Sequence, residues 1–365
     1  MPATIEPSAP LRHMPSAADR RSTLERMPKW LICVPLVVQW LWLGLRYRSL
    51  TLPSAANPAI TSGGLVGEGK LEYFNGMGPL ARAATARGGG VRNDGTHTAQ
   101  SLQAQMAQLG LDFPLVAKPD LGLCGHGVRR VDTMASLLEY LSRFPRGEVV
   151  VLQEYLPQEG EAGIFYARDP RDGQGKIIGL ALRTFPYVVG DGARTVGQLV
   201  QADPRASRLA VSARHECAFD PHAVPAAGET VRLATIGSTR VGGLYRDGVA
   251  CITPQLVAAI DAIARDMPQF HFGRFDVRFD TLAGLRAGEG LRIMEVNGAG
   301  SEAIEAWDPQ TGLLQGLRMI FRKQALLFAI GDARRREGVR PIPLVELARL
   351  NRRQYRLIEN YPPSN

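Results

Sequence analysis

Cysteine is scarce in this chain of 365 residues, which contains only Cys33, Cys124, Cys217 and Cys251. The four are widely spaced, with no C-x-x-C pair and no partnered histidine cluster, so neither a disulfide framework nor a zinc site is indicated. Nucleic-acid-binding patterns are also missing, because the basic residues do not interleave with aromatics and no zinc-finger, RRM or helix-turn-helix motif is present. We therefore expect a cytoplasmic protein without a nucleic-acid partner.

The composition is that of a folded protein with an excess of positive charge. Hydrophobic residues make up 45% and charged residues 21% of the chain, as in average globular domains. The formal net charge is +8, mostly from arginine, and the pI is about 9.6. Such a balance suits an anionic partner, of which a nucleotide and a membrane surface fit best.

The longest apolar run is at residues 30–45, WLICVPLVVQWLWLGL, which contain no charged residue. A membrane-spanning helix needs about 20 apolar residues, and this run is shorter and includes Pro35 and Gln39. Its tryptophans suit the interface between membrane and water. A helix at the inner membrane surface, a buried core helix and a true span all stay open as interpretations.

Changes in pattern along the chain predict five segments. A flexible arm (1–28) precedes the apolar helix (29–48), and a short α/β unit follows it (49–110). From there to residue 330, short apolar runs separated by turns predict strands, with helical stretches between them, so that this main domain (111–330) has the α+β class. A basic tail (331–365) ends the chain.

A lysine and three glycines form the first candidate site. An apolar strand ends at Lys118, and the loop that follows contains Gly122, Gly125 and Gly127. Glycines permit close approach of the backbone, so that N–H groups of such a loop can point at phosphates while the lysine supplies a fixed charge. An ordinary hairpin with a surface lysine is the competing interpretation. The earlier stretch GGLVGEGK at residues 63–70 resembles a phosphate loop only weakly, because it lacks the G-K-[ST] ending.

The second candidate site follows a buried strand that ends in Gln153 and Glu154. Backbone groups around Glu154 and Leu156 can pair with the edge of an adenine, and Glu161 can accept hydrogen bonds from ribose hydroxyls. Taken alone, this segment is more typical of a strand with a solvated acidic exit.

The third candidate site is the most specific. FGRFDVRF places Arg274, Asp276 and Arg278 on one face of a strand, and LRIMEVN places Glu295 and Asn297 on one face of the next. If the two strands pair, Asp276, Glu295 and Asn297 form the kind of oxygen site that Mg²⁺, or Mn²⁺, requires. The two arginines would then neutralise charge on a phosphoryl group in transfer. A salt-bridged sheet face is the alternative.

The three candidate sites follow one another as a lysine with a glycine loop, a hinge segment and a pair of metal-binding strands. In this order they resemble the ATP-grasp superfamily over residues 114–309. The resemblance implies that ATP lies between two α+β lobes, held by Lys118 and the glycine loop, with Gln153 to Leu156 as hinge and Glu161 on the ribose. It also implies Asp276, Glu295 and Asn297 as metal ligands. Arg274 matches the arginine that D-alanine–D-alanine ligase-like members place near an acyl phosphate. The second basic residue of the nucleotide site stays open between Lys176 and Arg183.

A further stretch, RTFPYVVGDGARTVGQLV at residues 183–200, resembles a segment of cyanophycin synthetase-like and glutathione synthase-like ligases. It implies amide-bond chemistry with small-molecule carboxylate and amine substrates, and Asp191 of this stretch is a candidate for contact with them. The resemblance also implies that residues 298–308, after the second metal strand, form the acceptor-side loop, where Ser301 and Glu302 are further candidates. Asp191 is also typical of a turn, and Ser301 of a helix cap.

A phosphotransferase with another acceptor and a nucleotide-binding membrane scaffold without turnover are the alternative functions. The oligomeric state is not predicted.

Overall fold

The computed structural model describes residues 23–211, 216 and 219–365. Most of the predicted arm, residues 1–22, lies outside the described part, as does Cys217. The end of that arm forms the short helix α1 (Thr23–Arg26), whose Leu24 is buried. Glu25 accepts a hydrogen bond of 2.8 Å from Arg205. These last residues of the arm are therefore packed and ion-paired rather than flexible.

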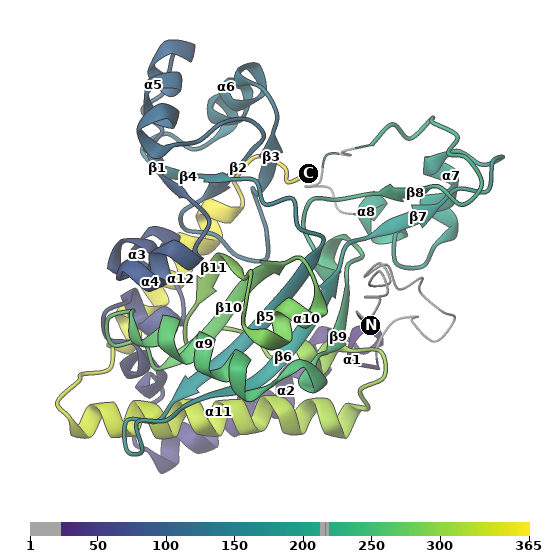
Figure 1. Ribbon diagram of the computed structural model, residues 1–365. Helices are drawn as coiled ribbons and strands as arrows, with labels where there is room; N and C mark the ends of the chain where they lie inside the picture. The colour runs from purple at the N-terminus through teal and green to yellow at the C-terminus, as the bar shows by residue number, and fades with distance from the viewer. Residues whose placement is uncertain (1–22, 212–215, 217–218) are drawn as a thin grey trace, which may run out of the picture.

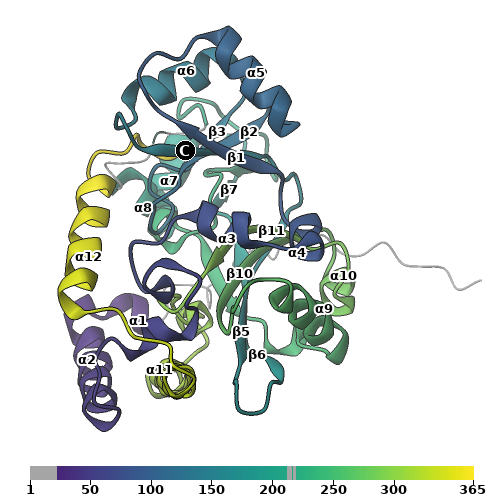
Figure 2. The ribbon, with the colours of Figure 1, turned by 90° about the vertical axis from the view of Figure 1, so that its left-hand side faces the viewer.

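A five-stranded antiparallel sheet forms the lower lobe (Figures 1 and 2), in the order β11-β10-β5-β6-β9. Its strands are β5 (Gly160–Arg168), β6 (Gly175–Thr184), β9 (Leu244–Asp247), β10 (Phe272–Phe279) and β11 (Arg292–Asn297). Helices α9 (Pro254–Arg265) and α10 (Leu282–Ala287) cover one face, and α11 (Leu313–Arg336) with the 3₁₀ helix η6 (Ile304–Trp307) covers the other. Thr253 caps α9 and Pro254 opens it, as expected for a helix start.

A second sheet, β1-β4-β2-β3, forms the upper lobe with α5 (Ala99–Leu109) and α6 (Met134–Arg143). Its strands are β1 (Gly88–Arg92), β2 (Leu115–Pro119), β3 (Arg129–Val131) and β4 (Val149–Glu154). Because β1 pairs with β4, the predicted boundary at residue 110 falls between strands of one sheet. The α+β class is confirmed.

A small projection carries β7 (Tyr187–Val189), β8 (Thr230–Arg232), α7 (Val196–Ala202) and α8 (Ser207–Val211) at the right of Figure 1. β7 and β8 form a separate two-stranded sheet. The projection has its own apolar cluster, which includes Val188 and Leu233. The 3₁₀ helices η4 (Thr239–Val241) and η5 (Val249–Cys251) flank β9.

Helix α2 (Lys29–Arg46) occupies the predicted apolar segment and lies along α11 at the base of the molecule (Figure 1). The two helices run in the same direction, since Gln39 donates to the Phe321 carbonyl at 2.8 Å and Arg335 donates to that of Tyr47 at 2.9 Å. Within residues 23–365, gaps aside, the structure contains no helix with the length and apolarity to cross a membrane.

The segment after α2 crosses between the lobes through η2 (Leu52–Ala56), η3 (Thr61–Gly64), α3 (Lys70–Gly76) and α4 (Pro79–Ala84). The predicted basic tail is instead the end of α11 and the helix α12 (Leu344–Ile358). Ile358 and Tyr361 are buried in the core of the upper lobe. Because this segment is rich in arginine, its sequence pattern did not predict that its apolar residues pack against the upper lobe.

Candidate functional site

Strands β10 and β11 bring the predicted metal residues together. They pair antiparallel, with Asp276 opposite Glu295 and Arg274 opposite Asn297. The other face of β10 carries Phe275, which is fully buried with its apolar neighbours in the sheet core. Alternation therefore places the polar side chains on the face that turns away from that core.

The carboxylate of Asp276 is the centre of a dense polar network. It is 4% exposed and accepts hydrogen bonds from Arg274 at 2.6 and 3.0 Å, from Arg183 at 2.9 Å and from the Asn297 amide at 3.2 Å. Burial raises the pKa of Asp276, but the two guanidinium groups outweigh burial and hold it below its ordinary value. The group is a carboxylate at neutral pH.

Arg183 joins this centre to Glu161. It donates to Glu161 at 3.0 Å, and Arg278 lies 3.4 Å from the other oxygen of the same buried carboxylate. Arg278 also donates to the Gln158 carbonyl at 2.7 Å. Of the two candidates for a second basic residue, the structure thus places Arg183 in the site, while Lys176 pairs with the surface residue Asp172.

Lys118 lies where the two lobes meet. From β2 it donates to the side chain of Gln153 at 2.7 Å and to the Met294 carbonyl of β11 at 2.9 Å. It is buried, no carboxylate of the described residues is in direct contact with it, and burial lowers its pKa to about 8. Gln153 thus holds the lysine.

Lys70, at the end of the weakly weighted GGLVGEGK stretch, also reaches the site. Its ammonium group is 3.3 Å from Glu295 and 3.4 Å from the Asp120 carbonyl. Burial raises the pKa of Glu295, and the charges of Lys70 and Lys118 bring it below its ordinary value. Because the G-K-[ST] ending is missing, the sequence pattern did not single out Lys70. Its place in the site depends on the contact with Glu295 of β11, which lies more than 200 positions away in the sequence.

The loop with the three predicted glycines follows Lys118. Gly125 and Gly127 both have φ of +72°, which side chains rarely adopt, and a Cβ on Gly122 would lie 3.1 Å from the Lys70 ammonium. The C-terminal segment holds the loop in place, because Gln354 donates to the Gly122 carbonyl at 3.1 Å.

The side chain of Glu154 is engaged in ion pairs. It is 3.0 Å from Arg87 and also pairs with Arg292, while its backbone N–H donates to the Arg87 carbonyl. Burial raises the pKa of Glu154, but hydrogen bonds from Arg87 and the charge of Arg292 bring it below its ordinary value. Both the side chain and the backbone N–H of Glu154 are thus paired within the protein, and Leu156, two residues on, is buried.

The predicted substrate residues differ in position. The Ser301 hydroxyl is buried and has no hydrogen-bond partner among the described residues, and Ser301 caps no helix. Glu302 has an exposed side chain, and its carbonyl accepts from Arg274 at 3.2 Å. Asp191 lies in the projection, where it accepts from the N–H groups of residues 193 and 194 and pairs with Arg194 at 2.6 Å. The contacts of Asp191 are those of a turn.

Sequence reasoning also missed a buried ion pair between Lys323 of α11 and Glu305 of η6. The Lys323 ammonium lies 3.1 Å from the ring centroid of Phe165, and the guanidinium of Arg274 lies 5.6 Å from the same ring. Burial lowers the pKa of Lys323 to about 8. A lysine in a basic helix gives no sign of burial in the sequence.

A magnesium ion fits the chemistry of Asp276, Glu295 and Asn297. Within the described part of the chain, no three His, Cys, Asp or Glu side chains cluster as a metal site, so these residues qualify only with the amide of Asn297 included. They supply oxygen donors, and Glu295 is still 33% exposed. The guanidinium groups on Asp276 would have to yield one of its oxygens to a cation.

No protein-family model matches the chain, and no curated protein matches it in sequence. A bifunctional glutathione synthetase from Pasteurella multocida is 16% identical over 70% of this chain and 36% of its own length, with a TM-score of 0.35. VanG D-Ala:D-Ser ligase from Enterococcus faecalis is 13% identical over 71% of this chain and 61% of its own, with a TM-score of 0.38. D-cycloserine synthetase DcsG is 14% identical over 73% of this chain and 69% of its own length, with a TM-score of 0.37.

The likenesses to these solved structures are remote, with TM-scores between 0.35 and 0.38. The match spans little more than a third of the first of them. At such scores, the activity of this chain has to be argued from its own geometry.

Proposed function

We propose that this chain is an ATP- and Mg²⁺-dependent ligase of the ATP-grasp type, which activates a carboxylate and joins it to an amine. The observation that carries the proposal is the meeting of two lobes at one polar centre. Lys118 comes from the upper sheet and Asp276 and Glu295 come from the lower sheet, and Lys118 reaches the carbonyl of Met294, the residue before Glu295 on β11.

In this proposal the nucleotide lies between the lobes. Lys118 and the loop of Gly122, Gly125 and Gly127 bind its phosphates, and the backbone around Glu154 and Leu156 binds its adenine. Glu161 is proposed to accept from the ribose, in exchange for one of its contacts to Arg183 and Arg278. A lysine whose charged form is disfavoured by burial gains most from a polyanion, because ion pairing offsets the penalty of burial.

Asp276, Glu295 and Asn297 would hold the magnesium ion, which supplies charge neutralisation at the phosphates when bound. Arg274 and Arg278 would then face the transferring group. Arg274 is already anchored by the Glu302 carbonyl, so little reorganisation is needed for it to meet a developing negative charge.

The proposed reaction has two steps. A carboxylate oxygen of the substrate forms a bond to the γ-phosphorus while the bond from that phosphorus to the β,γ-bridging oxygen breaks, which gives an acyl phosphate and ADP. An amine then attacks the acyl carbon, inorganic phosphate leaves, and the amine loses a proton, which gives an amide. Arg274 stabilises the charge of both steps, and the Ser301 hydroxyl is proposed to donate to a substrate oxygen.

The decisive experiment measures ADP release across a panel of carboxylic acids and amines, with hydroxylamine as a trap. An acyl phosphate gives a hydroxamate, whereas phosphoryl transfer to another acceptor gives ADP without one. Tight ATP binding with no ADP over the whole panel would instead favour a scaffold without turnover.

Asp276→Asn tests the metal residues in the same assay. We expect a loss of at least a hundredfold in ADP release, because this change removes a charged ligand at the phosphates. Asp172→Asn, at a surface pair with Lys176, is the matched control and should keep full turnover. Unchanged turnover in Asp276→Asn would refute the metal assignment.

A further inference from the structure

Helix α2 exposes an apolar face to solvent. Its outward side chains recur at helical spacing and include two tryptophans near its ends, Trp30 and Trp42, which are 68% and 54% exposed. The other members of this face are Leu31, Val34, Val37, Val38, Leu41 and Leu45. Contiguous exposed apolar surface of this kind on a folded protein marks an interaction site.

The opposite face of α2 explains why the helix is fixed in this orientation. Ile32 and Leu43 are buried there, and Trp40 stacks edge to face on Phe328 of α11 with 5.0 Å between ring centroids. Gln39 is the polar residue on this inward face, and its amide donates a hydrogen bond to the Phe321 carbonyl. The exposed face is therefore presented by a helix that is already anchored.

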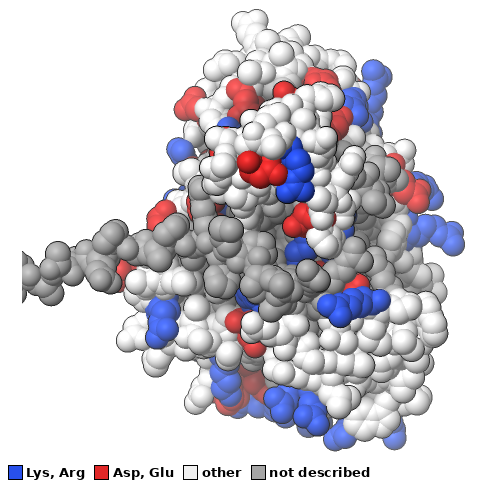
Figure 3. Space-filling model, turned by 90° about the vertical axis from the view of Figure 1, so that its right-hand side faces the viewer, with Lys and Arg blue, Asp and Glu red and all other residues white. Residues whose placement is uncertain are grey.

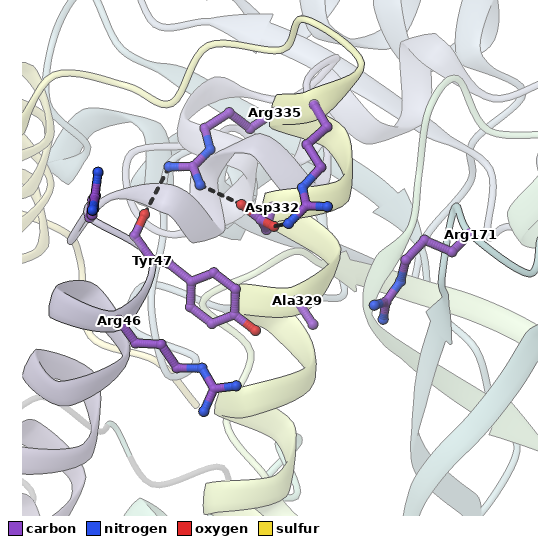
Figure 4. Close-up of a pocket in the computed structure, with 8 residues that line it drawn as sticks. Arg46, Tyr47, Arg171, Ala329, Asp332 and Arg335 are labelled. Atoms are coloured by element: carbon purple, nitrogen blue, oxygen red, sulfur yellow. Dashed lines mark hydrogen bonds and ion pairs between the residues drawn. The ribbon is translucent and has the colours of Figure 1, made fainter.

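A cavity of about 450 Å³ lies at the C-terminal end of this helix (Figure 4). Five arginines line it together with Tyr47, Ala329 and Asp332, namely Arg46, Arg48, Arg171, Arg335 and Arg336. Figure 3 shows the molecule from the opposite end of α2, and several basic side chains with fewer acidic ones are exposed along the base there.

The charge of this cavity is not neutralised within the described part of the chain. Asp332 pairs with Arg335 and Arg336, and Asp169 pairs with Arg171, but neither Arg46 nor Arg48 has a carboxylate partner among the described residues. The C-terminal dipoles of α2 and α11 offset only about half a charge each. A positive excess is left beside an apolar face.

An apolar face beside a cationic cavity matches an anionic amphiphile. In a bilayer the acyl region and the phosphate headgroups are adjacent, and tryptophan favours the boundary between them. We propose that the exposed face of α2 docks on an anionic lipid bilayer, with the phosphate of one lipid headgroup in the arginine cavity. This surface is separate from the proposed ligase site, so the two proposals stand or fall independently.

Vesicle flotation of the full chain tests the docking surface, with vesicles of phosphatidylcholine alone or with added phosphatidylglycerol. We expect binding to the anionic vesicles, weakened at 1 M salt, where the screening length falls to about 3 Å. Arg46→Gln with Arg48→Gln should weaken it about 25-fold, at about fivefold per arginine. Trp42→Ser with Leu45→Ser should weaken binding to every vesicle by at least about tenfold.

The matched controls are two exposed arginines and two exposed apolar residues on α12. Arg352→Gln with Arg356→Gln, and Leu344→Ser with Val345→Ser, should bind vesicles like the unchanged protein. ATP affinity should be the same in all four variants. Equal vesicle binding by the α2 and α12 variants would overturn the proposal.

Two other occupants are outcomes that would also overturn it. If glycerol phosphate binds the cavity but the chain does not float with anionic vesicles, the ligand is a free phosphate ester. If sedimentation velocity shows a dimer that Trp42→Ser with Leu45→Ser dissociates, and no vesicle binding occurs, a second copy of the chain covers the face.

Discussion

At the scale of single residues, burial decides how the candidate site titrates. Lys118 is the clearest case, because burial lowers its pKa to about 8 and no carboxylate in the described part of the chain is in direct contact with it. Nucleotide phosphates would favour its charged form and raise that pKa. Below pH 8 Lys118 is already protonated when ATP binds, whereas above pH 8 Lys118 must take up a proton on binding.

We therefore predict that ATP affinity falls about tenfold for each pH unit above 8, where the phosphates of ATP are already fully ionised. Calorimetric titration at a series of pH values measures it. Lys118→Arg, which stays protonated throughout, should lose the slope even if its affinity is lower. A slope that persists in this variant would assign the pH dependence to another group.

Glu68 provides a second residue-scale prediction, on stability. Burial raises its pKa from 4.5 to about 7. Its contribution to folding is therefore fully present below pH 4.5 and is lost as the pH rises through 7, an effect of about 3 kcal/mol. Urea unfolding of Glu68→Gln should show a smaller fall in the free energy of unfolding between pH 5 and 8. Parallel curves for the variant and the unchanged protein would contradict this.

At the scale of elements, the buried amide of Asn57 ties the N-terminal segment to β10. Asn57 donates to the carbonyls of Gly63 and Phe272 at 2.9 and 2.8 Å, and it accepts from the N–H groups of His271 and Phe272 at 2.8 and 3.1 Å. It thereby fixes η2 and η3 against the start of β10. Alignment of these elements brings Glu68 and Lys70 to the site.

Asn57→Ala should lower the free energy of unfolding by about 4 kcal/mol, since it leaves several buried backbone groups without partners. Denaturant unfolding followed by fluorescence measures the change. Asn360→Ala removes an exposed amide with one bond to the Arg356 carbonyl, and should cost less than about 0.5 kcal/mol. Comparable losses in the two variants would disprove the role given to Asn57.

At the scale of the whole molecule, the C-terminal segment connects the lower lobe to the glycine loop. Tyr361 stacks on Phe144 with 5.1 Å between ring centroids, and its hydroxyl donates to the Leu121 carbonyl at 2.6 Å. Figure 2 shows α12 rising along the side of the molecule from the level of α11 to the upper sheet. The loop is thus held from a point more than 200 residues away in sequence.

Tyr361→Ala should cost about 3 to 5 kcal/mol and also loosen the loop, because both the stacking and the hydrogen bond are lost. Tyr361→Phe keeps the stacking and should cost about 1 kcal/mol. Hydrogen exchange of residues 120–128, together with ATP affinity, measures the loop itself. If exchange in this loop is the same in both variants, the segment stabilises the upper lobe without holding the loop.

The local sequence by itself determined the polar and apolar faces of the strands that carry the candidate site. Alternation in FGRFDVRF and LRIMEVN predicted that Asp276 and Glu295 lie together if the two strands pair, because side chains alternate across a strand, and the two strands do pair with Asp276 opposite Glu295. Only the tertiary structure decided that Lys70, Arg183 and the Lys323–Glu305 pair lie around them, that β1 belongs to the upper sheet, and that the arginine-rich C-terminus is a packed helix. The physical reason is that a local pattern sets which side of an element is polar, whereas its partner depends on the path of the whole chain.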